Sequence, residues 1–174
     1  MSEMQIIYIV AGIIACLFLL AYSEKKKKKK KIRYIKQADE IIAKLKTFDG
    51  QHKEAQILTY LRKINPYVFE ELLLTVLQKR GYRIERNKRY SHDGGIDGKF
   101  YDGENLFLIQ AKRYTAHIDP KHLKEFQQKI FIHKAKGGLF IHTGKTGQTA
   151  RNEYRDGQIK IISGQKLVEL IVDE

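Results

Sequence analysis

Residues 93–112 read DGGIDGKFYDGENLFLIQAK, and this stretch predicts the β-hairpin at the centre of the fold. The dipeptide Asp102-Gly103 is a strong signal for a two-residue turn, because a type I′ turn needs positive φ and both residues tolerate it. With the turn centred there, Tyr101 is expected to face Glu104. The two strands on either side of the turn therefore form an antiparallel pair.

Acidic, amide and basic side chains fall on one face of this predicted hairpin. In the register set by the turn, Asp97 faces Leu108. The alternation of the pleat then puts Asp97, Gln110 and Lys112 on the same face of adjacent strands. The diagonal from Asp97 to Gln110 is short enough for both oxygens to share one metal ion.

The second strand of the hairpin is expected to be buried. The run LFLI before Gln110 is apolar on both faces, as in a strand that lies between layers of helix. A lysine at the end of such a strand, Lys112, needs a partner, because burying an unpaired charge costs several kcal/mol or removes the proton. From these residues alone, a catalytic site and an ordinary ion pair between Asp97 and Lys112 remain alternatives.

Capping and periodicity predict the elements on either side of the hairpin. Asn65-Pro66 and Asp119-Pro120 each combine an N-cap side chain with proline at the first helical position. The predicted order is a helix from 65 to Gly81, a strand over 82–90, the hairpin, a helix over 119–134, a strand over 139–143, a short helix over 146–155, a strand over 158–162 and a final helix capped by Ser163. This order indicates an α/β fold in which an antiparallel hairpin leads into parallel crossovers, giving a mixed sheet flanked by helices.

Composition limits the classes of function and of site. The formal net charge is +13, but the seven lysines Lys25 to Lys31 supply much of it, and residues 65–174 contain 19 Lys and Arg against 14 Asp and Glu. This moderate excess suits a polyanionic partner without requiring one. Cys16 is the only cysteine in the sequence, which excludes an intramolecular disulfide and a cysteine-based zinc site.

An apolar run, Ile6 to Tyr22, precedes the lysine tract. We expect a single transmembrane helix here, with the following chain in the cytoplasm because the cations follow the run. The alternatives are an apolar helix packed in a core and, for the lysine tract, a nucleic-acid-binding arm instead of a contact with anionic lipid headgroups. The predicted parts are therefore 1–24 (N-terminus and span), 25–64 (lysine tract and amphipathic helices, either a stalk or packed on the domain) and 65–174 (catalytic domain).

Several segments spread over most of residues 65–171 resemble the Mrr-type restriction endonucleases, a family within the PD-(D/E)xK nuclease superfamily. PYVFEELL resembles the opening helix of that family, GYRIERNK its first strand, and HDGGIDG and FLIQAKRY its two catalytic segments. GGLFIHTG and IISGQKLVELI resemble its closing elements. Together these segments are far more specific than an isolated aspartate and lysine.

The resemblance implies roles for individual residues. Asp97 corresponds to the metal-binding aspartate, Gln110 to the glutamate or glutamine position, Lys112 to the catalytic lysine and Glu70 to an acidic residue of the opening helix. The side chains of Asp97 and Gln110 and the carbonyl of Ala111 would hold Mg²⁺, with Mn²⁺ as a substitute, since hard ions take oxygen ligands. Gln110 departs from the glutamate of the wider superfamily, so this site has one negative charge fewer.

Other side chains have weaker assignments. Arg113, Tyr114 and Lys145 are candidates for contacts with a nucleic acid, with an ordinary solvated position as the alternative for each. Asp93 is assigned to a turn in preference to a metal site, and Glu71 is expected to be solvated.

The sequence as a whole predicts a membrane-anchored, Mg²⁺-dependent DNA endonuclease that acts in restriction or defence on the cytoplasmic side of the membrane. The rival hypothesis is a module that has lost its catalysis and tethers DNA at the membrane. The intact set of Asp97, Gln110 and Lys112 argues against the rival. The sequence does not determine the DNA specificity, and a homodimer remains open.

Overall fold

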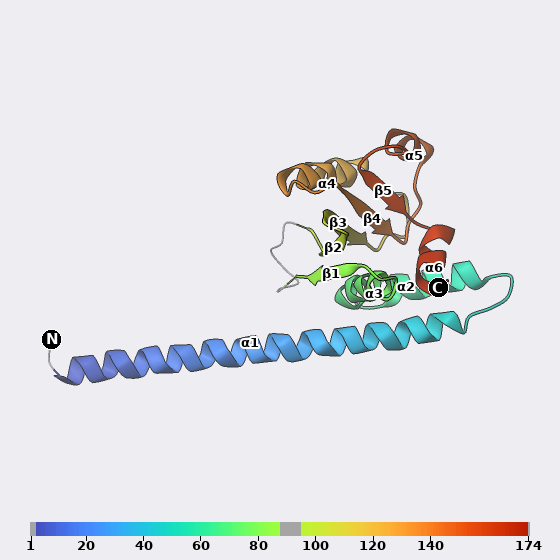
Figure 1. The fold of residues 1–174 in the computed structure, drawn as a ribbon. Helices are drawn as coiled ribbons and strands as arrows, with labels where there is room; N and C mark the ends of the chain where they lie inside the picture. The colour runs from blue at the N-terminus through green and yellow to red at the C-terminus, as the bar shows by residue number, and fades with distance from the viewer. Residues whose placement is uncertain (1–2, 88–94, 174) are drawn as a thin grey trace. The chain divides into compact units, whose positions relative to one another are not determined.

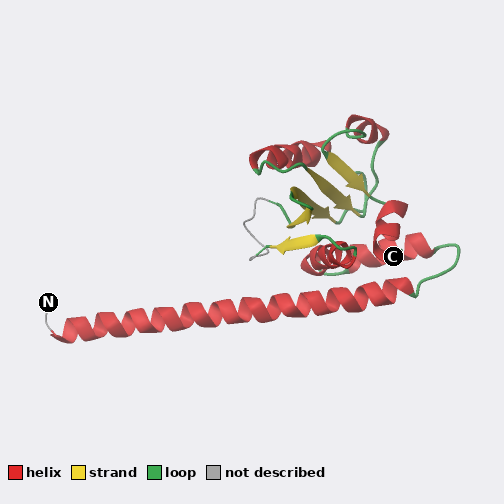
Figure 2. Cartoon of the chain, viewed as in Figure 1, coloured by secondary structure: helices red, strands yellow, loops and turns green. Residues whose placement is uncertain are grey.

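The computed structural model describes residues 3–87 and 95–173, and this part of the chain holds six helices and five strands (Figures 1 and 2). The chain divides into two compact units, Met1–Tyr34 and Ile35–Glu174. In chain order the elements are α1 (Glu3–Lys46), α2 (Lys53–Lys63), α3 (Pro66–Lys79), β1 (Arg83–Arg86), β2 (Gly98–Asp102), β3 (Asn105–Lys112), α4 (Pro120–Ile132), β4 (Gly137–His142), α5 (Gln148–Glu153), β5 (Ile159–Ile162) and α6 (Gln165–Val172).

The two predicted helix starts are confirmed. Asn65 accepts the amide of Tyr67 at 2.9 Å and caps α3. Asp119 accepts the amide of Lys121 at 2.9 Å and caps α4. The last helix starts one residue later than predicted, because its N-cap is Gly164, with a φ of 56°.

The five strands form one mixed sheet in the order β1-β2-β3-β4-β5. β1, β2 and β3 pair in an antiparallel manner, while β3, β4 and β5 are parallel. The prediction of an antiparallel hairpin that leads into parallel crossovers is therefore confirmed. Because β3, β4 and β5 are parallel, their carboxyl ends meet at one edge of the sheet.

Helices cover both faces of the sheet (Figure 2). On one face the second part of α1 packs with α2, α3 and α6 on four buried sheet residues, Phe100, Ile109, Ile141 and Ile162. On the other face α4 and α5 pack on Leu108, Phe140 and Ile159. The central strands are thus buried on both sides, which accounts for the apolar run before Gln110.

The hairpin turn differs from the prediction by two residues in register. Asp102 pairs with Asn105 and Tyr101 with Leu106, so the turn residues are Gly103 and Glu104. Gly103 has a φ of 59°, as at the first central position of a type II′ turn, which replaces the expected type I′ turn. A shift of two residues leaves every side chain on its predicted face, because side chains alternate with period two.

The amphipathic region before α3 packs into the core, one of the two alternatives left open by the sequence. Ile42, Leu45, Ile57 and Leu61 are at most 3% exposed and belong to the same apolar cluster as Leu72 of α3. A loop separates α1 from α2 and includes Gly50, whose φ is 82°. Packing of this region gives the sheet a complete helical layer on that side.

The N-terminal segment does not support the expected membrane span. In the residues that the structure describes, no helix is apolar over a length sufficient to cross a bilayer. The apolar run Ile6 to Tyr22 has 17 residues, which is about 25 Å of helix against a hydrocarbon core of about 30 Å. α1 then continues without a break through the lysine tract to Lys46.

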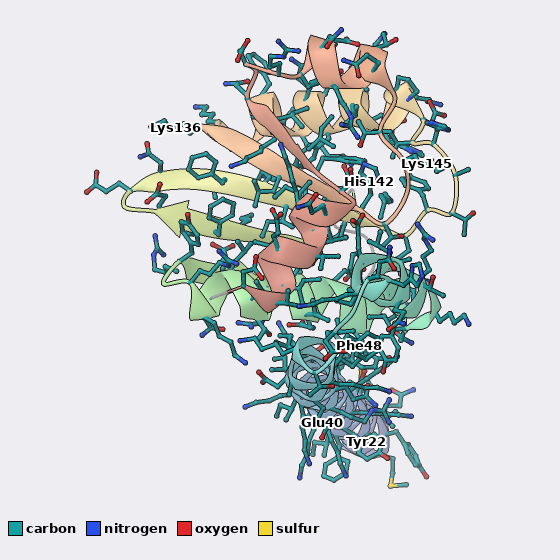
Figure 3. The ribbon with its side chains drawn as sticks, turned by 90° about the vertical axis from the view of Figure 1, so that its right-hand side faces the viewer. Tyr22, Glu40, Phe48, Lys136, His142 and Lys145 are labelled. Atoms are coloured by element: carbon teal, nitrogen blue, oxygen red, sulfur yellow. The ribbon has the colours of Figure 1, made fainter. Side chains whose placement is uncertain are left out.

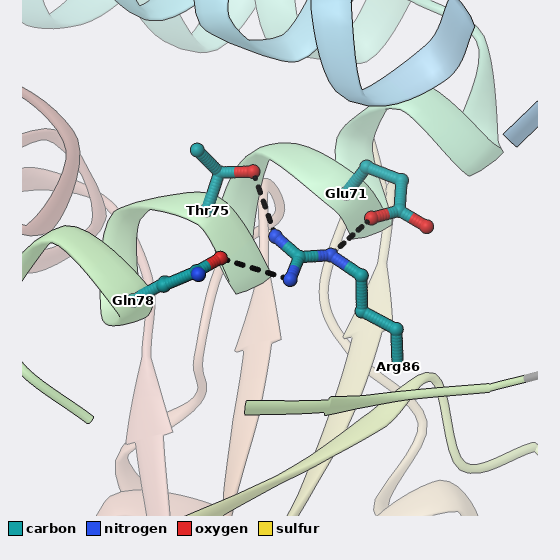
Figure 4. A network of polar contacts seen from close by, with 4 residues as sticks. All are labelled: Glu71, Thr75, Gln78 and Arg86. Carbon is teal, nitrogen blue, oxygen red and sulfur yellow. Dashed lines mark hydrogen bonds and ion pairs between the residues drawn. The ribbon is translucent and has the colours of Figure 1, made fainter. Parts of the chain in front are cut away.

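Glu71 is buried, so the expectation that it is solvated was wrong. The residue is 1% exposed, and its Oε2 accepts a hydrogen bond from the Nε of Arg86 at 2.8 Å (Figure 4). The same guanidinium donates to the Oγ1 of Thr75 at 3.2 Å and to the Oε1 of Gln78 at 2.9 Å. Helix α3 therefore fixes strand β1 through a buried ion pair.

Candidate active site

The centre of the candidate active site is the contact between Asp97 and β3. Asp97 lies just before β2, and its amide donates to the carbonyl of Ile109 at 2.8 Å. Its Oδ2 accepts the amide of Ala111 at 2.6 Å. Continuing the observed register by one residue places Asp97 opposite Gln110, closer than the diagonal predicted from the sequence. The structure therefore brings the three predicted metal-binding residues together.

The side-chain oxygen of Gln110, Oε1, is the atom of this site that points most directly to a bound ligand. The side chain is 2% exposed. Its Oε1 is the one buried side-chain N or O atom without a hydrogen-bond partner among the residues that the structure describes. Leaving a buried acceptor unsatisfied costs about 1–3 kcal/mol, so such an atom needs a functional explanation. A cation bound at this oxygen supplies one.

Glu70 of α3 faces the same centre. Burial, with a smaller contribution from the charges of Asp97 and Glu71, raises the pKa of its carboxyl to about 8, although Lys112 and Arg113 act in the opposite direction. Glu70, Asp97 and Lys112, three of the four predicted catalytic residues, therefore lie within electrostatic reach of one another. Glu70 holds a proton at neutral pH until a cation approaches, since a nearby positive charge favours the ionised form.

Lys129 of α4 belongs to this cluster, although the sequence analysis did not identify it. A Cβ atom built on Gly95 would lie 2.8 Å from the Nζ of Lys129 and 3.3 Å from the Nε2 of Gln110. Burial lowers the pKa of Lys129, and the positive charge of Lys112 lowers it further. Gly95, with a φ of 80°, leaves the space that this lysine occupies. Helical periodicity places a charged residue near the end of α4 but does not indicate that it reaches Gln110.

Arg113 and Tyr114, two of the nucleic-acid candidates, take part in a structural network. Arg113 Nη1 donates to the carbonyls of Arg62 at 3.0 Å and of Ile64 at 2.5 Å. Arg62 in turn donates through Nε to the carbonyl of Tyr114 at 3.2 Å and through Nη2 to that of Thr143 at 2.6 Å. These bonds link the end of α2 to the ends of β3 and β4. They hold the strand that carries Lys112, and a role of Arg113 or Tyr114 in binding DNA stays a prediction.

Tyr114 and the remaining candidates have distinct environments. The Tyr114 hydroxyl and His122 Nδ1 are 2.5 Å apart. Lys145 is exposed in the loop after β4, and its amide donates to the carbonyl of Ala116 at 3.0 Å. Asp93 lies outside the described residues. Over 3–87 and 95–173, no group of three or more His, Cys, Asp or Glu side chains is placed to hold a metal, so an ion here needs amide and carbonyl oxygens as well.

His142 ends β4 beside Lys112, with which it is paired in the sheet register. The imidazole is fully buried, and burial lowers its pKa to about 4, so the ring is neutral at pH 7. Its Nε2 is 3.0 Å from the Oγ1 of Thr146, which is 2.9 Å from the Oγ of Ser163. This chain of polar contacts runs along the carboxyl edge of the sheet from β4 to β5. Figure 3 shows His142 near this edge and Lys136 at the other end of the strand.

Comparisons with known proteins agree with the geometry. Residues 61–171, more than half of the chain, match the family described as Restriction endonuclease. The Type IV methyl-directed restriction enzyme EcoKMrr of Escherichia coli (strain K12) is 31% identical over 127 residues, and the match covers 68% of this chain but only 41% of that enzyme. The chain thus spans less than half the length of this relative.

Two solved structures share the fold. The MspJI restriction endonuclease in complex with a 27-mer oligonucleotide has a TM-score of 0.56 at 23% identity, over 72% of this chain and 32% of MspJI. The DNA modification-dependent restriction endonuclease AspBHI has a TM-score of 0.50 at 20% identity, over 72% and 36% of the two chains. With the match over residues 61–171, these findings place the chain in the Mrr-type restriction endonuclease family.

Proposed function

We propose that this chain is an endonuclease that hydrolyses phosphodiester bonds of DNA with Mg²⁺, or with Mn²⁺ in its place. The observation that carries the proposal is the unpartnered, buried Oε1 of Gln110 beside the carboxylate of Asp97. Together with the Ala111 carbonyl, these oxygens form the donor set that a hard divalent ion prefers. The family match over residues 61–171 supports the same reaction.

The chain's own residues divide the chemistry among them. A divalent ion held by Asp97, Gln110 and Ala111 would polarise the scissile phosphate and lower the pKa of the attacking water. Lys112 orients that water or stabilises the charge that develops on the phosphate. Lys129 supplies a second positive charge on the side of α4.

The charges of the site indicate that metal and DNA bind together. At neutral pH the two lysines face the single carboxylate of Asp97, since the raised pKa of Glu70 leaves that group protonated. Without DNA the cluster therefore carries excess positive charge and attracts a cation weakly. A bound phosphate supplies the missing negative charge, so each ligand should raise the affinity for the other.

We propose modified DNA as the substrate class, in a restriction function. EcoKMrr is described as methyl-directed and AspBHI as DNA modification-dependent, and the common fold and family make the same substrate the first to test here. The test incubates the full chain with methylated and unmethylated plasmid, in Mg²⁺ and in EDTA, with Lys112→Ala as the control. Cleavage of the methylated plasmid, in Mg²⁺ and not in EDTA, supports the proposal. Binding without cleavage by the wild type would favour the inactive tethering module instead.

We also propose that the N-terminal segment attaches the enzyme to the cytoplasmic surface of a membrane. Large apolar side chains of α1 are exposed, among them Ile14, Leu17 and Phe18 at 60%, 60% and 76%, and the cationic tract Lys25–Lys31 follows. Apolar and basic groups in succession suit anionic headgroups. Flotation of the chain with phosphatidylserine vesicles, but not with phosphatidylcholine vesicles, is expected. Equal recovery in the bottom fraction with both would refute attachment.

A further inference from the structure

A basic groove lies beside the edge strand β5, apart from the residues assigned to catalysis. It consists of two adjoining cavities of about 420 and 410 Å³ that share Arg151, Ile161 and Lys166. The first is lined by Gln148, Arg151, Tyr154, Arg155, Lys160, Ile161 and Lys166, and thus by four cations and no acidic side chain. The second continues to the carboxyl end of β5 and includes Thr146, Ser163 and Glu54.

The positive charges of the basic groove are not neutralised within the described part of the chain. No ion pair there involves Arg151, Arg155, Lys160 or Lys166. Arg151 donates to the carbonyl of Thr146 at 3.3 Å and Arg155 to the amide oxygen of Asn152 at 3.3 Å, which are neutral acceptors. All four side chains are exposed. Like charges that gather without acidic partners raise the local potential and favour an anionic ligand.

The position of the groove relates it to the active site. β3, β4 and β5 are parallel neighbours, so their carboxyl ends, at Lys112, His142 and Ile162, follow one another along one edge of the sheet. Two strand spacings separate the ends of β3 and β5, about 10 Å. One DNA strand advances about 3.4 Å per nucleotide along the helix axis, so the near end of the groove, at Ser163, lies about three nucleotides from Lys112. Lys160 lies further back along β5, opposite Leu139.

We propose that the basic groove binds backbone phosphates of the duplex, beginning about three nucleotides from the bond held at Lys112. This inference rests on the proposed DNA endonuclease function and adds to it a second contact with the substrate. The two adjoining cavities and the four cations that line the first of them fit a polymer of phosphates. The groove positions the duplex and carries no sequence information, since phosphate contacts are the same for every base.

The test compares two double variants of the full chain. Arg155→Gln with Lys160→Gln removes two charges of the groove. Lys124→Gln with Lys134→Gln removes two exposed charges of α4 and the turn after it, and neither residue lines the groove. Fluorescence anisotropy with a 30-base-pair duplex in EDTA, from 50 to 200 mM salt, gives the affinity and its salt dependence, and thermal melts check the fold of each variant.

The groove variant is expected to bind about tenfold more weakly than the wild type, with a slope of log affinity against log salt that is shallower by about two. The control pair should keep the wild-type slope. Equal affinities and slopes for the two double variants would overturn the groove assignment and leave the nuclease proposal intact. A wild-type chain that binds no duplex at any salt concentration would overturn both.

A second measurement tests the spacing. Uncharged methylphosphonates replace the phosphates two to four nucleotides from the cleavage position. This change should weaken binding of the wild type and leave the groove variant unaffected. Equal losses for both proteins would place those phosphates elsewhere on the surface.

Discussion

Replacing Gln110 by glutamate tests the metal site through stability. The substitution changes little in size and introduces a carboxylate at a position that is 2% exposed. Next to it is the carboxylate of Asp97. In the same cluster, burial together with nearby charges already raises the pKa of the Glu70 carboxyl to about 8. Without Mg²⁺, the new group meets the same desolvation and the same negative neighbour, and the nearby ammonium groups of Lys112 and Lys129 offset only part of that cost.

The size of the effect follows from proton binding. A buried glutamate can avoid an unpaired charge by keeping its proton, and this costs about 1.36 kcal/mol for each pH unit above its ordinary pKa of about 4.3. The loss of stability in EDTA is therefore limited to about 4 kcal/mol at pH 7.5 and to about 1.6 kcal/mol at pH 5.5. For a chain of this length, 4 kcal/mol lowers the Tm by roughly 8–16 °C. A bound Mg²⁺ removes most of this loss, since it pairs with the ionised group.

The assay is thermal unfolding of the wild type and Gln110→Glu at both pH values, in EDTA and in Mg²⁺. Gln127→Glu, on the exposed side of α4, is the matched control and should behave as the wild type in all four conditions. The expected result is a Tm deficit that is larger at pH 7.5 than at pH 5.5 and that Mg²⁺ largely restores. A deficit of the same size with and without Mg²⁺ would show that Gln110 does not bind the ion and would remove the main support for the metal site.

Four further outcomes are expected. Lys112→Ala should reduce plasmid cleavage by about 10³-fold while binding of DNA in EDTA and the Tm stay near wild type; cleavage at the wild-type rate would exclude this lysine from the reaction. Lys129→Met should lower the cleavage rate by roughly 10²-fold, in contrast to Lys124→Met on the exposed surface of the same helix, and equal rates for the two would leave Lys129 without a catalytic role. Calorimetric titration should show weak Mg²⁺ binding to the free protein and tighter binding with a non-cleavable duplex, and an affinity unaffected by DNA contradicts the charge argument. Between pH 6.5 and 4, the stability of His142→Gln should depend less on pH than that of the wild type. Burial lowers the pKa of His142 in the folded protein to about 4, so as the pH falls the unfolded chain takes up the proton first and the wild type loses up to about 3 kcal/mol of stability. Identical slopes of stability against pH for the two proteins would contradict this.

Much of the catalytic domain could be predicted because its local signals agree with the global fold. The caps at Asn65 and Asp119 set the starts of two helices, and each signal needs only a few consecutive residues. The hairpin shows how such a prediction tolerates error. The predicted turn has Gly103 at its second central position, whereas the observed turn has Gly103 at the first. Asp97 and Gln110 still lie on one face, because this difference shifts the strand register by two residues, an even number. An error of one residue would have separated the two groups by the thickness of the sheet.

Contacts between distant segments could not be predicted in this way. Glu71 looks like an ordinary charged helix residue, and its burial depends on Arg86, which arrives from β1, 15 residues later. The role of Arg62 is similar, since it binds carbonyls at the ends of two strands that follow it by 52 and 81 residues. Neither contact leaves a local pattern, because its partner is fixed only when the sheet and the helices have assembled.

Among these contacts between distant segments, the approach of Lys129 to Gln110 matters most for the proposed reaction. Its approach to Gln110 requires the backbone at Gly95 to lie without a side chain against the end of α4, in a conformation with positive φ that favours glycine. The resemblance to nucleases identifies Lys112 but carries no information on a second lysine from another helix. Its presence changes the electrostatics of the proposed reaction, because an amide ligand in place of a carboxylate and an added ammonium both shift the site toward positive charge. Such a site depends on the substrate phosphate for its full complement of negative ligands, and this favours assembly of the active metal centre on DNA over assembly in the free protein.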